Sequence, residues 1–338
     1  MTLSWQSFLD NLGAHRNAQG YACYFSDQRS HFTSVNTIIG DHLAIITVRG
    51  PEAEKFLQGQ LTCDVAQVTQ GHMRLAMHLD LKGRGQYSYQ VLPYLAGSGN
   101  GGFDLLTAKA HANGALAALK KYAVFSKVSL DIDDERVAIM LREPPADDLL
   151  DGLSVPPLIG QSQQGRQSTL VRLDQQWLLL LTPEGGARTL LNHYPLAEMG
   201  AANHWLEYEI HAGVGHIQPG TEGLWLPQAL NYDLLDGVNF KKGCYLGQEV
   251  VARMHFKGKM KQRMQRLQWQ GGVNASPGDV LRDSNDHAVG ELVSAVEGDG
   301  GCDALVVLRL DHSGELTLNS QPLAWRQTNL PYALPSVS

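Results

Sequence analysis

Two patterns of apolar residues divide this 338-residue chain and restrict the folds that it can adopt. Up to about Met264, strand-like runs alternate with helical ones. The run Leu43–Val48 is strand-like, and a helix is expected to begin at Gly50-Pro51-Glu52 and to end at Gly59. Beyond Met264 the pattern changes to short alternating strands separated by glycine, proline and asparagine, which is typical of a small antiparallel barrel. The sequence therefore predicts an α+β protein with a C-terminal β-barrel.

The same alternation predicts the remaining elements and a division into domains. Pro144-Pro145 interrupts the pattern, and the proline- and glutamine-rich run 155–167 is expected to be a connection. We expect three domains, at residues 1–142, 143–262 and 263–338. The predicted strands are 103–107, 125–131, 136–141, 168–173 and 177–182, and the predicted helices are 108–121, a run after Pro183, and 202–210.

Composition limits the partners and the compartment. With 27 basic and 34 acidic residues, the formal charge of −7 provides no global attraction to nucleic acid or to an anionic membrane. The cysteines form no C-x-x-C pair, which argues against a disulfide framework and against a sequence-local zinc or cluster site. No run has the length of a membrane span, and the first residues lack the pattern of a signal peptide, so a cytoplasmic protein without membrane contact is expected. The four cysteines are Cys23, Cys63, Cys244 and Cys302.

One short stretch, Lys241–Glu249, concentrates the residues that carry chemistry. Its sequence is Lys-Lys-Gly-Cys-Tyr-Leu-Gly-Gln-Glu, and its two glycines allow a sharp turn and close approach to the cysteine. If Gly247 ends the turn and Gln248 begins a helix, Cys244 lies near a helix N-terminus, where partial positive charge and the two lysines, Lys241 and Lys242, favour the thiolate. This predicts a reactive or ligating cysteine; the alternative is a small cysteine buried between two glycines.

A second basic feature lies between two strand-like runs within residues 74–92. Lys82-Gly83-Arg84-Gly85 is typical of a hairpin turn. Lys82 and Arg84 could simply be solvated, or they could hold an anionic group such as the glutamate tail of a folate through charge-assisted hydrogen bonds.

Three stretches carry a family resemblance. Residues 242–249, Lys-Gly-Cys-Tyr-x-Gly-Gln-Glu, followed by Val-Val-Ala-Arg253, resemble the signature of the YgfZ family of folate-binding proteins, relatives of the glycine-cleavage T-protein. The stretch 119–128 and Trp205 with the following Ala212-Gly213 are similar to the same family. The resemblance covers roughly residues 40 to 330. It implies a T-protein-like (GcvT-like) fold, in which ferredoxin-like α/β units surround a central cavity, with a C-terminal barrel.

The resemblance also implies site residues and a ligand, tetrahydrofolate or a derivative, with no permanently bound metal. Cys244 is the functional cysteine and a possible transient cluster ligand. For Trp205, a wall of the pterin slot is one interpretation, and a core anchor of its helix is the other. The supporting motif residues are Lys242, Gly243, Tyr245, Gly247, Gln248, Glu249 and Arg253, and the folate residues are Trp205, His211, Lys82 and Arg84.

Three departures from the T-protein pattern bear on activity. His211 stands where T-protein relatives carry a pterin-binding glutamate, and Leu43 stands where family members carry a second tryptophan. The stretch 86–90, where T-protein has its catalytic aspartate, contains Tyr87 and Ser88 and no carboxylate. Because tyrosine and serine are not ionised at neutral pH, we expect aminomethyl transfer to be lost.

The segment 241–266 is strongly basic, with a single acid, Glu249. It could face RNA or a protein partner, although a solvated face is the simpler interpretation, and Phe256 is the only aromatic residue beside the lysines. Glu249 and Arg253 could pair on one helix face, or Glu249 or Gln248 could orient the cysteine loop. The basic residues are Lys241, Lys242, Arg253, Lys257, Lys259, Lys261, Arg263 and Arg266.

The resemblance and the residues together give three functional hypotheses. The resemblance implies an accessory protein for iron–sulfur cluster assembly or repair that supports cluster-dependent tRNA methylthiolation, with iron–sulfur proteins such as a tRNA methylthiotransferase as transient partners. A folate-dependent one-carbon transferase is the second hypothesis, and the missing carboxylate opposes it. The third is a cysteine-dependent thiol transferase or hydrolase, which requires a histidine such as His216 or His255 beside Cys244.

Overall fold

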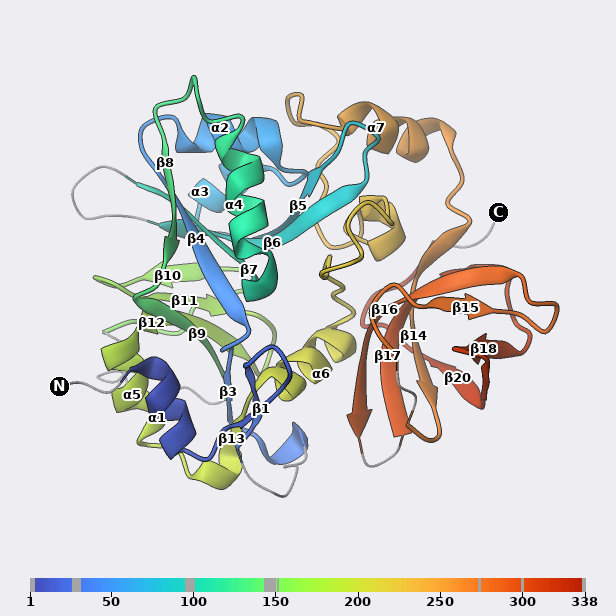
Figure 1. The fold of residues 1–338 in the computed structure, drawn as a ribbon. Helices are drawn as coiled ribbons and strands as arrows, with labels where there is room; N and C mark the ends of the chain where they lie inside the picture. Colours follow the sequence, from blue (N-terminus) through green and yellow to red (C-terminus); the bar gives the residue numbers. More distant parts are fainter. Residues whose placement is uncertain are drawn as a thin grey trace. The chain divides into compact units, whose positions relative to one another are not determined.

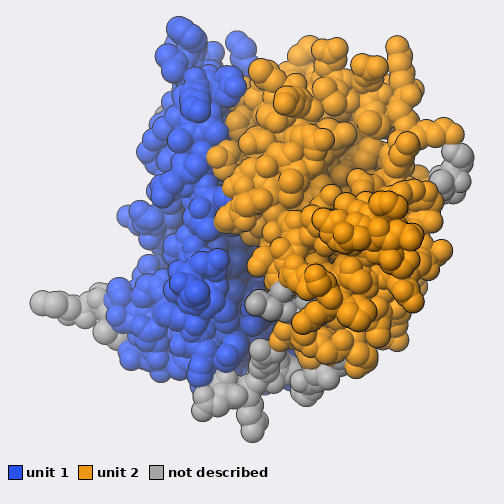
Figure 2. Space-filling view, turned by 45° about the vertical axis from the view of Figure 1, so that its right-hand side comes forward, with its two compact units in different colours: residues 1–57, 65–74, 90–205 blue, residues 58–64, 75–89, 206–338 orange. Residues whose placement is uncertain are grey.

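The computed structural model describes residues 4–25, 32–94, 101–142, 150, 152–272, 275–298 and 301–335. The chain divides into two compact units, which Figure 2 colours separately. Unit 1 comprises residues 1–57, 65–74 and 90–205, and unit 2 comprises residues 58–64, 75–89 and 206–338. The three-domain division at residues 142 and 262 stays a prediction.

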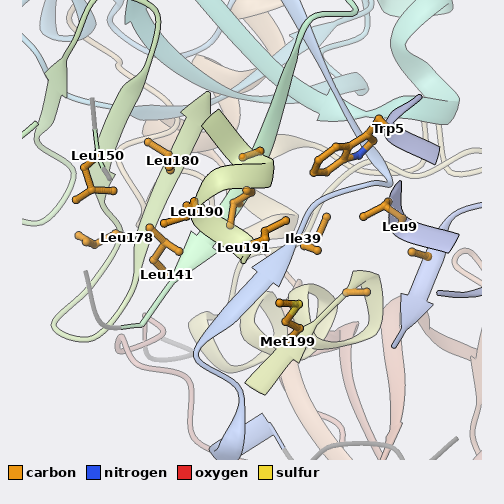
Figure 3. Packing of buried hydrophobic residues seen from close by; sticks show 14 of the residues in the cluster. Trp5, Leu9, Ile39, Leu141, Leu150, Leu178, Leu180, Leu190, Leu191 and Met199 are labelled. Atoms are coloured by element: carbon orange, nitrogen blue, oxygen red, sulfur yellow. The ribbon is translucent and has the colours of Figure 1, made fainter. Parts of the chain in front are cut away.

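A six-stranded sheet and its helices form one part of unit 1. The strands are antiparallel neighbours except for the parallel pair β13 and β3. Its apolar face packs with α1 (Trp5–Asn11) and α5 (Glu184–Leu191) around buried leucines, isoleucines and Trp5 (Figure 3). The order is β10 (Ser162–Gln164), β11 (Thr169–Arg172), β12 (Leu178–Pro183), β9 (Arg136–Leu141), β3 (Thr37–Ile39) and β13 (Met199–Gly200).

A five-stranded sheet carries the predicted hairpin turn between its first two strands (Figure 1). In the middle of β7, the buried Asp104 accepts hydrogen bonds from Arg49 and Arg136, which satisfies its charge inside the sheet. The order is β5 (Arg74–Leu79), β6 (Gly85–Tyr94), β7 (Gly102–Ala108), β4 (Leu43–Arg49) and β8 (Ser129–Asp133). The accompanying helices are α2 (Ala53–Gln60), α3 (Val65–Thr69), η2 (Lys109–His111) and α4 (Ala112–Lys120).

The C-terminal part of unit 2 is the antiparallel barrel-like sheet that the sequence predicted. Alternate residues of its strands point into one apolar core, which includes Leu267, Leu292 and Val306. Before it come α6 (Ala202–Ala212), η5 (Pro227–Leu230) and α7 (Gln248–Lys257). The strand order is β19 (Gln321–Leu323), β18 (Leu316–Leu318), β15 (Val280–Arg282), β16 (Ala288–Gly298), β17 (Gly301–Arg309), β14 (Gln262–Trp269) and β20 (Trp325–Thr328).

Smaller elements complete the described chain, and in this part of it no helix is long and apolar enough to cross a membrane. The smaller elements are β1 (His15–Arg16), β2 (Ala22–Tyr24), η1 (Phe32–Ser34) and η4 (Leu196–Glu198).

The predicted α+β class with its barrel is confirmed, and several predicted boundaries were wrong. Gly50 to Glu52 form a turn, and α2 begins at Ala53 and continues through Gly59 to Gln60. The strand expected from Phe125 begins only at Ser129, because residues 123–128 form tight turns and the Glu52 carboxylate accepts a hydrogen bond from the Lys127 amide. The expected connection 155–167 contains the short strand β10, and Pro144-Pro145 lies outside the described residues.

Candidate functional site

Cys244 lies on an exposed loop immediately before α7. As expected, Gly247 ends the turn, with φ of 77°, and Gln248 is the first residue of the helix. The thiol of Cys244 is exposed, whereas the other three cysteines are buried. The interpretation of Cys244 as a buried packing residue was therefore wrong.

The hairpin turn of unit 2 packs against the start of α7. A Cβ atom on Gly247 would collide with the carbonyl oxygen of Asp80 and would lie 3.1 Å from the Cα of Gly83. Gly83 also has a positive φ, of 75°, and the Asp80 carboxylate fixes this turn by accepting the amides of Lys82, at 2.8 Å, and Arg84, at 2.9 Å. Two stretches far apart in sequence, the basic turn and the cysteine motif, are thus neighbours because both have glycine where their backbones meet.

The side chain of Lys242 anchors the cysteine loop to the backbone of residues 61 and 63. Its Nζ donates hydrogen bonds to the carbonyl oxygens of Leu61 and Cys63, both at 2.7 Å, and lies 5.0 Å from the centroid of the Tyr245 ring. Burial lowers the pKa of Lys242 to about 8. We expected this charge to act on the Cys244 thiol; within the described residues, its hydrogen bonds go to the backbone instead.

Two side chains hold the backbone of the loop. The Gln248 Oε1 accepts a hydrogen bond from the Tyr245 amide at 3.2 Å, so the expected orienting role of Gln248 has its contact. The Asn239 Oδ1 accepts the amides of Lys241, at 2.7 Å, and Lys242, at 3.1 Å. Sequence reasoning missed Asn239, although an asparagine two residues before a turn is a known signal for such an Asx turn.

The expected pairing of Glu249 with Arg253 is absent from the described residues. Both side chains are exposed on α7, and no hydrogen bond or ion pair joins them there. Glu249 therefore has no demonstrated part in ordering the loop, and Gln248 alone fulfils that expectation.

The four folate candidates have different environments. Trp205 is only 1% exposed and packs edge-on against His42, with ring centroids 5.7 Å apart, so it is a core anchor with no open face. The Nε2 of His211 contacts the Asp303 carboxylate at 3.4 Å, and Arg84 donates to the carbonyl oxygens of Leu224 and Gly223. Lys82 is exposed, with no side-chain partner among the described residues.

His211 belongs to a charged cluster on the barrel. Arg266 donates two hydrogen bonds to Asp303, at 2.9 and 2.5 Å, and Gln268 donates a third. Burial would raise the pKa of Asp303, but the hydrogen bonds from Arg266, His211 and Gln268 hold it well below its usual range. His211 thus lies beside a satisfied carboxylate, which accounts for its contacts without a ligand.

The stretch 86–90, where the resemblance led us to expect a missing carboxylate, contains Ser88, which belongs to a buried polar cluster. The Ser88 Oγ lies 3.2 Å from the His216 Nδ1 and accepts the Ile217 amide at 2.9 Å. On the other side of the ring, the His216 Nε2 lies 3.3 Å from the Glu209 carboxylate. His216 therefore lies between Ser88 and Glu209, in a cluster that the sequence did not reveal.

Neither candidate histidine supports a cysteine-dependent hydrolase. The ring of His255 stacks on Phe240, with centroids 3.7 Å apart, and no contact of either histidine with Cys244 occurs in the described part of the chain. Across the same residues, no group of three or more His, Cys, Asp or Glu side chains is placed to hold a metal ion.

The fold defines a class of protein. The structure aligns with the glycine cleavage system aminomethyltransferase T from Bartonella henselae with a TM-score of 0.73, over 98% of this chain and 97% of that one, at 20% sequence identity. The chain therefore has the aminomethyltransferase T fold.

Sequence comparison then gives the family. The chain is 33% identical over 269 residues to the tRNA-modifying protein YgfZ of Escherichia fergusonii, covering 77% of this chain and 81% of that protein. It is 32% identical over 307 residues to the protein of the same name from Sodalis glossinidius, covering 83% and 90%. No family model matches the chain. The chain belongs to the YgfZ family.

Proposed function

We propose that this chain supports tRNA modification through the thiol of Cys244. The observation that carries the proposal is an exposed thiol on a loop held by Lys242, Asn239 and Gln248 and by the close contact of Gly247 with the hairpin turn. A loop so fixed presents its sulfur in one place, as a ligand or reactive group requires. The relatives named tRNA-modifying protein supply the process.

A single thiolate limits what the loop can do with an iron–sulfur cluster. Protein-bound clusters are generally held by four ligands, so Cys244 could only share a cluster with another protein. The proposed partner is a cluster-containing enzyme such as a tRNA methylthiotransferase, which this chain would help to load or repair. The cluster is the cargo in this proposal and not a resident group.

Aminomethyl transfer is not part of the proposal, in spite of the fold. Ser88 lies in the stretch where a carboxylate is expected; it is only 3% exposed, and its Oγ is bonded to the backbone and to His216. A serine so placed has no charge with which to accept a proton at neutral pH.

Folate remains a proposed ligand, but fewer of the predicted folate residues support it in the structure. Trp205 is enclosed, and His211 and Arg84 have protein partners, so of the four candidates Lys82 is the one with an unengaged charge in the described residues. No step is therefore assigned to folate. Folate binding is tested by titrating the full chain with tetrahydrofolate and recording tryptophan fluorescence. The absence of a saturable change in fluorescence would contradict folate binding.

The test of Cys244 is a replacement in cells. In a strain that lacks its own copy of this chain, wild type should restore methylthiolated tRNA nucleosides, whereas Cys244→Ala should leave them at the level of the deletion strain. Because the side chain is exposed, the unfolding free energy should change by no more than about 0.5 kcal/mol. Nucleosides are quantified by mass spectrometry, and unfolding is measured in urea.

The matched control is Leu81→Ala, which removes a side chain that is 81% exposed beside the hairpin turn. It should behave as wild type. Full methylthiolation with Cys244→Ala would refute the role of the thiol.

A further inference from the structure

The C-terminal end of α7 carries a cluster of three rings that the sequence did not suggest. Phe240 and His255 stack with centroids 3.7 Å apart and planes 13° apart, and Phe256 meets His255 edge-on at 4.8 Å. Phe256 is 69% exposed. An exposed ring resting on a stacked pair is a ready platform for another flat group.

Basic residues adjoin these rings along the chain, since Lys241 follows Phe240 and Lys257 follows Phe256. Of the eight basic residues in 241–266, Lys242 donates to backbone carbonyls, Arg263 pairs with Asp233, and Arg266 pairs with Asp303. Four others are exposed and have no ion pair or side-chain hydrogen bond in the described chain. These four are Lys241, Arg253, Lys257 and Lys261.

The acids near this surface leave its positive charge largely uncompensated. Asp311 pairs with Arg309, and Asp233 pairs with Arg263, so each is neutralised by its own arginine. The helix α7 itself carries one acid, Glu249. It lies seven residues before Phe256 and therefore two turns away on the same face.

A pocket of about 480 Å³ opens beside the rings. Met254, Met260 and Leu310 give it apolar walls. Its polar lining includes His255 and Lys261 and the ion pairs Arg263–Asp233 and Arg309–Asp311. Flexible methionines beside cations suit a flat heterocycle that carries a phosphate.

We propose that this surface, formed by Phe240, Lys241, Arg253, His255, Phe256, Lys257 and Lys261, binds a single-stranded segment of RNA directly. An unpaired base stacks on Phe256, and the lysines contact the phosphates on either side. An acidic protein would match the charge equally; we favour RNA because a ring that is 69% exposed next to exposed lysines can stack a base while the lysines contact the flanking phosphates. This proposal rests on the proposed function, in which the chain supports tRNA modification. It adds that the chain binds RNA directly.

The test measures binding of a fluorescent oligouridine of about 12 nucleotides to the full chain by anisotropy over a range of salt concentrations. Phe256→Ala should weaken binding roughly 10-fold or more without changing the salt dependence, because stacking is uncharged. The double variant Lys257→Gln/Lys261→Gln should instead lower the slope of log affinity against log salt, by about 0.7 for each phosphate that the protein no longer neutralises.

The control is Phe125→Ala, which removes a ring that is 97% exposed near Lys121 and Lys127 in unit 1. It should bind as wild type does. An equal loss with Phe125→Ala, or no salt-dependent binding by wild type, would overturn the proposal. So would a Phe256→Ala variant that binds normally yet fails in cells, because the surface would then dock a protein.

The role of the Cys244 thiol and the binding of RNA can be refuted independently of each other. Cys244→Ala should retain full RNA affinity, since the thiol is outside the ring cluster. Normal tRNA modification with Cys244→Ala would end the proposed function while binding through Phe256 would still be measured in the purified chain.

Discussion

At the scale of single residues, the position of the cysteine loop depends on two glycines, Gly247 and Gly83. Cys244 is presented by a loop whose position is set by Gly247, and Gly247 fits because neither it nor Gly83 has a Cβ atom. The start of α7 could be predicted from the sequence, because a glycine that ends a turn before a helical run is a local signal, whereas the exposure of Cys244 was one of two interpretations.

Other residues of the site could not be predicted in this way. The burial of Trp205 depends on His42 and Gly40, which come from a different part of the chain. The two carbonyl oxygens that bind Lys242 belong to residues 61 and 63, about 180 positions earlier. Such contacts exist only in the folded chain, so the residue types alone do not reveal them.

A pair of glycine substitutions tests the closeness of the two turns. Gly247→Ala should destabilise the protein by more than about 1 kcal/mol, because alanine is strained at a φ of 77° and its Cβ would collide with the Asp80 carbonyl. Urea unfolding of the full chain measures this free energy.

Gly243→Ala provides the matched comparison, since a Cβ atom there meets nothing within 4 Å. Its unfolding free energy should stay within about 0.5 kcal/mol of wild type. If the two variants lose equal stability, the close packing of Gly247 does not fix the loop.

At the scale of elements, periodicity was informative where one face of a strand or helix is buried. The strand Arg136–Leu141 was predicted to the residue, and the helix after Pro183 and the barrel strands were found where they were expected. Boundaries failed where side chains capped a turn, as Glu52 does for Lys127. The strand β10 escaped prediction because its residues, Ser162–Gln164, are polar and only half-buried.

Assembly of elements explains the ring cluster as well. Phe240 precedes α7 by a loop, and His255 and Phe256 lie at its other end. The sequence therefore showed one aromatic residue among lysines, whereas the fold brings three rings together. That change is why RNA contact becomes a specific proposal only with the structure.

At the scale of the whole molecule, a buried histidine should make the protein sensitive to acid. His78 on β5 is 3% exposed, and burial lowers its pKa from 6.5 to about 4. The folded pKa is below the unfolded one, so this contribution to stability is complete above about pH 6.5 and is lost as the pH falls towards 4.

Urea unfolding at pH 7 and pH 4.5 should show the effect against His78→Gln. Between these two values wild type should lose about 2 kcal/mol more stability than the variant, since each pKa unit corresponds to about 1.4 kcal/mol. Parallel pH profiles for the two proteins would contradict this assignment.

The distribution of cysteines offers a practical consequence. Cys23, Cys63 and Cys302 are enclosed, and burial raises the pKa of Cys23 and, to about 12, that of Cys302. A maleimide dye or a nitroxide added to the unmodified protein should attach to one sulfur, just ahead of α7. The unmodified chain can therefore be labelled at one known position. Binding of an RNA or an enzyme could then be followed through that label without any substitution.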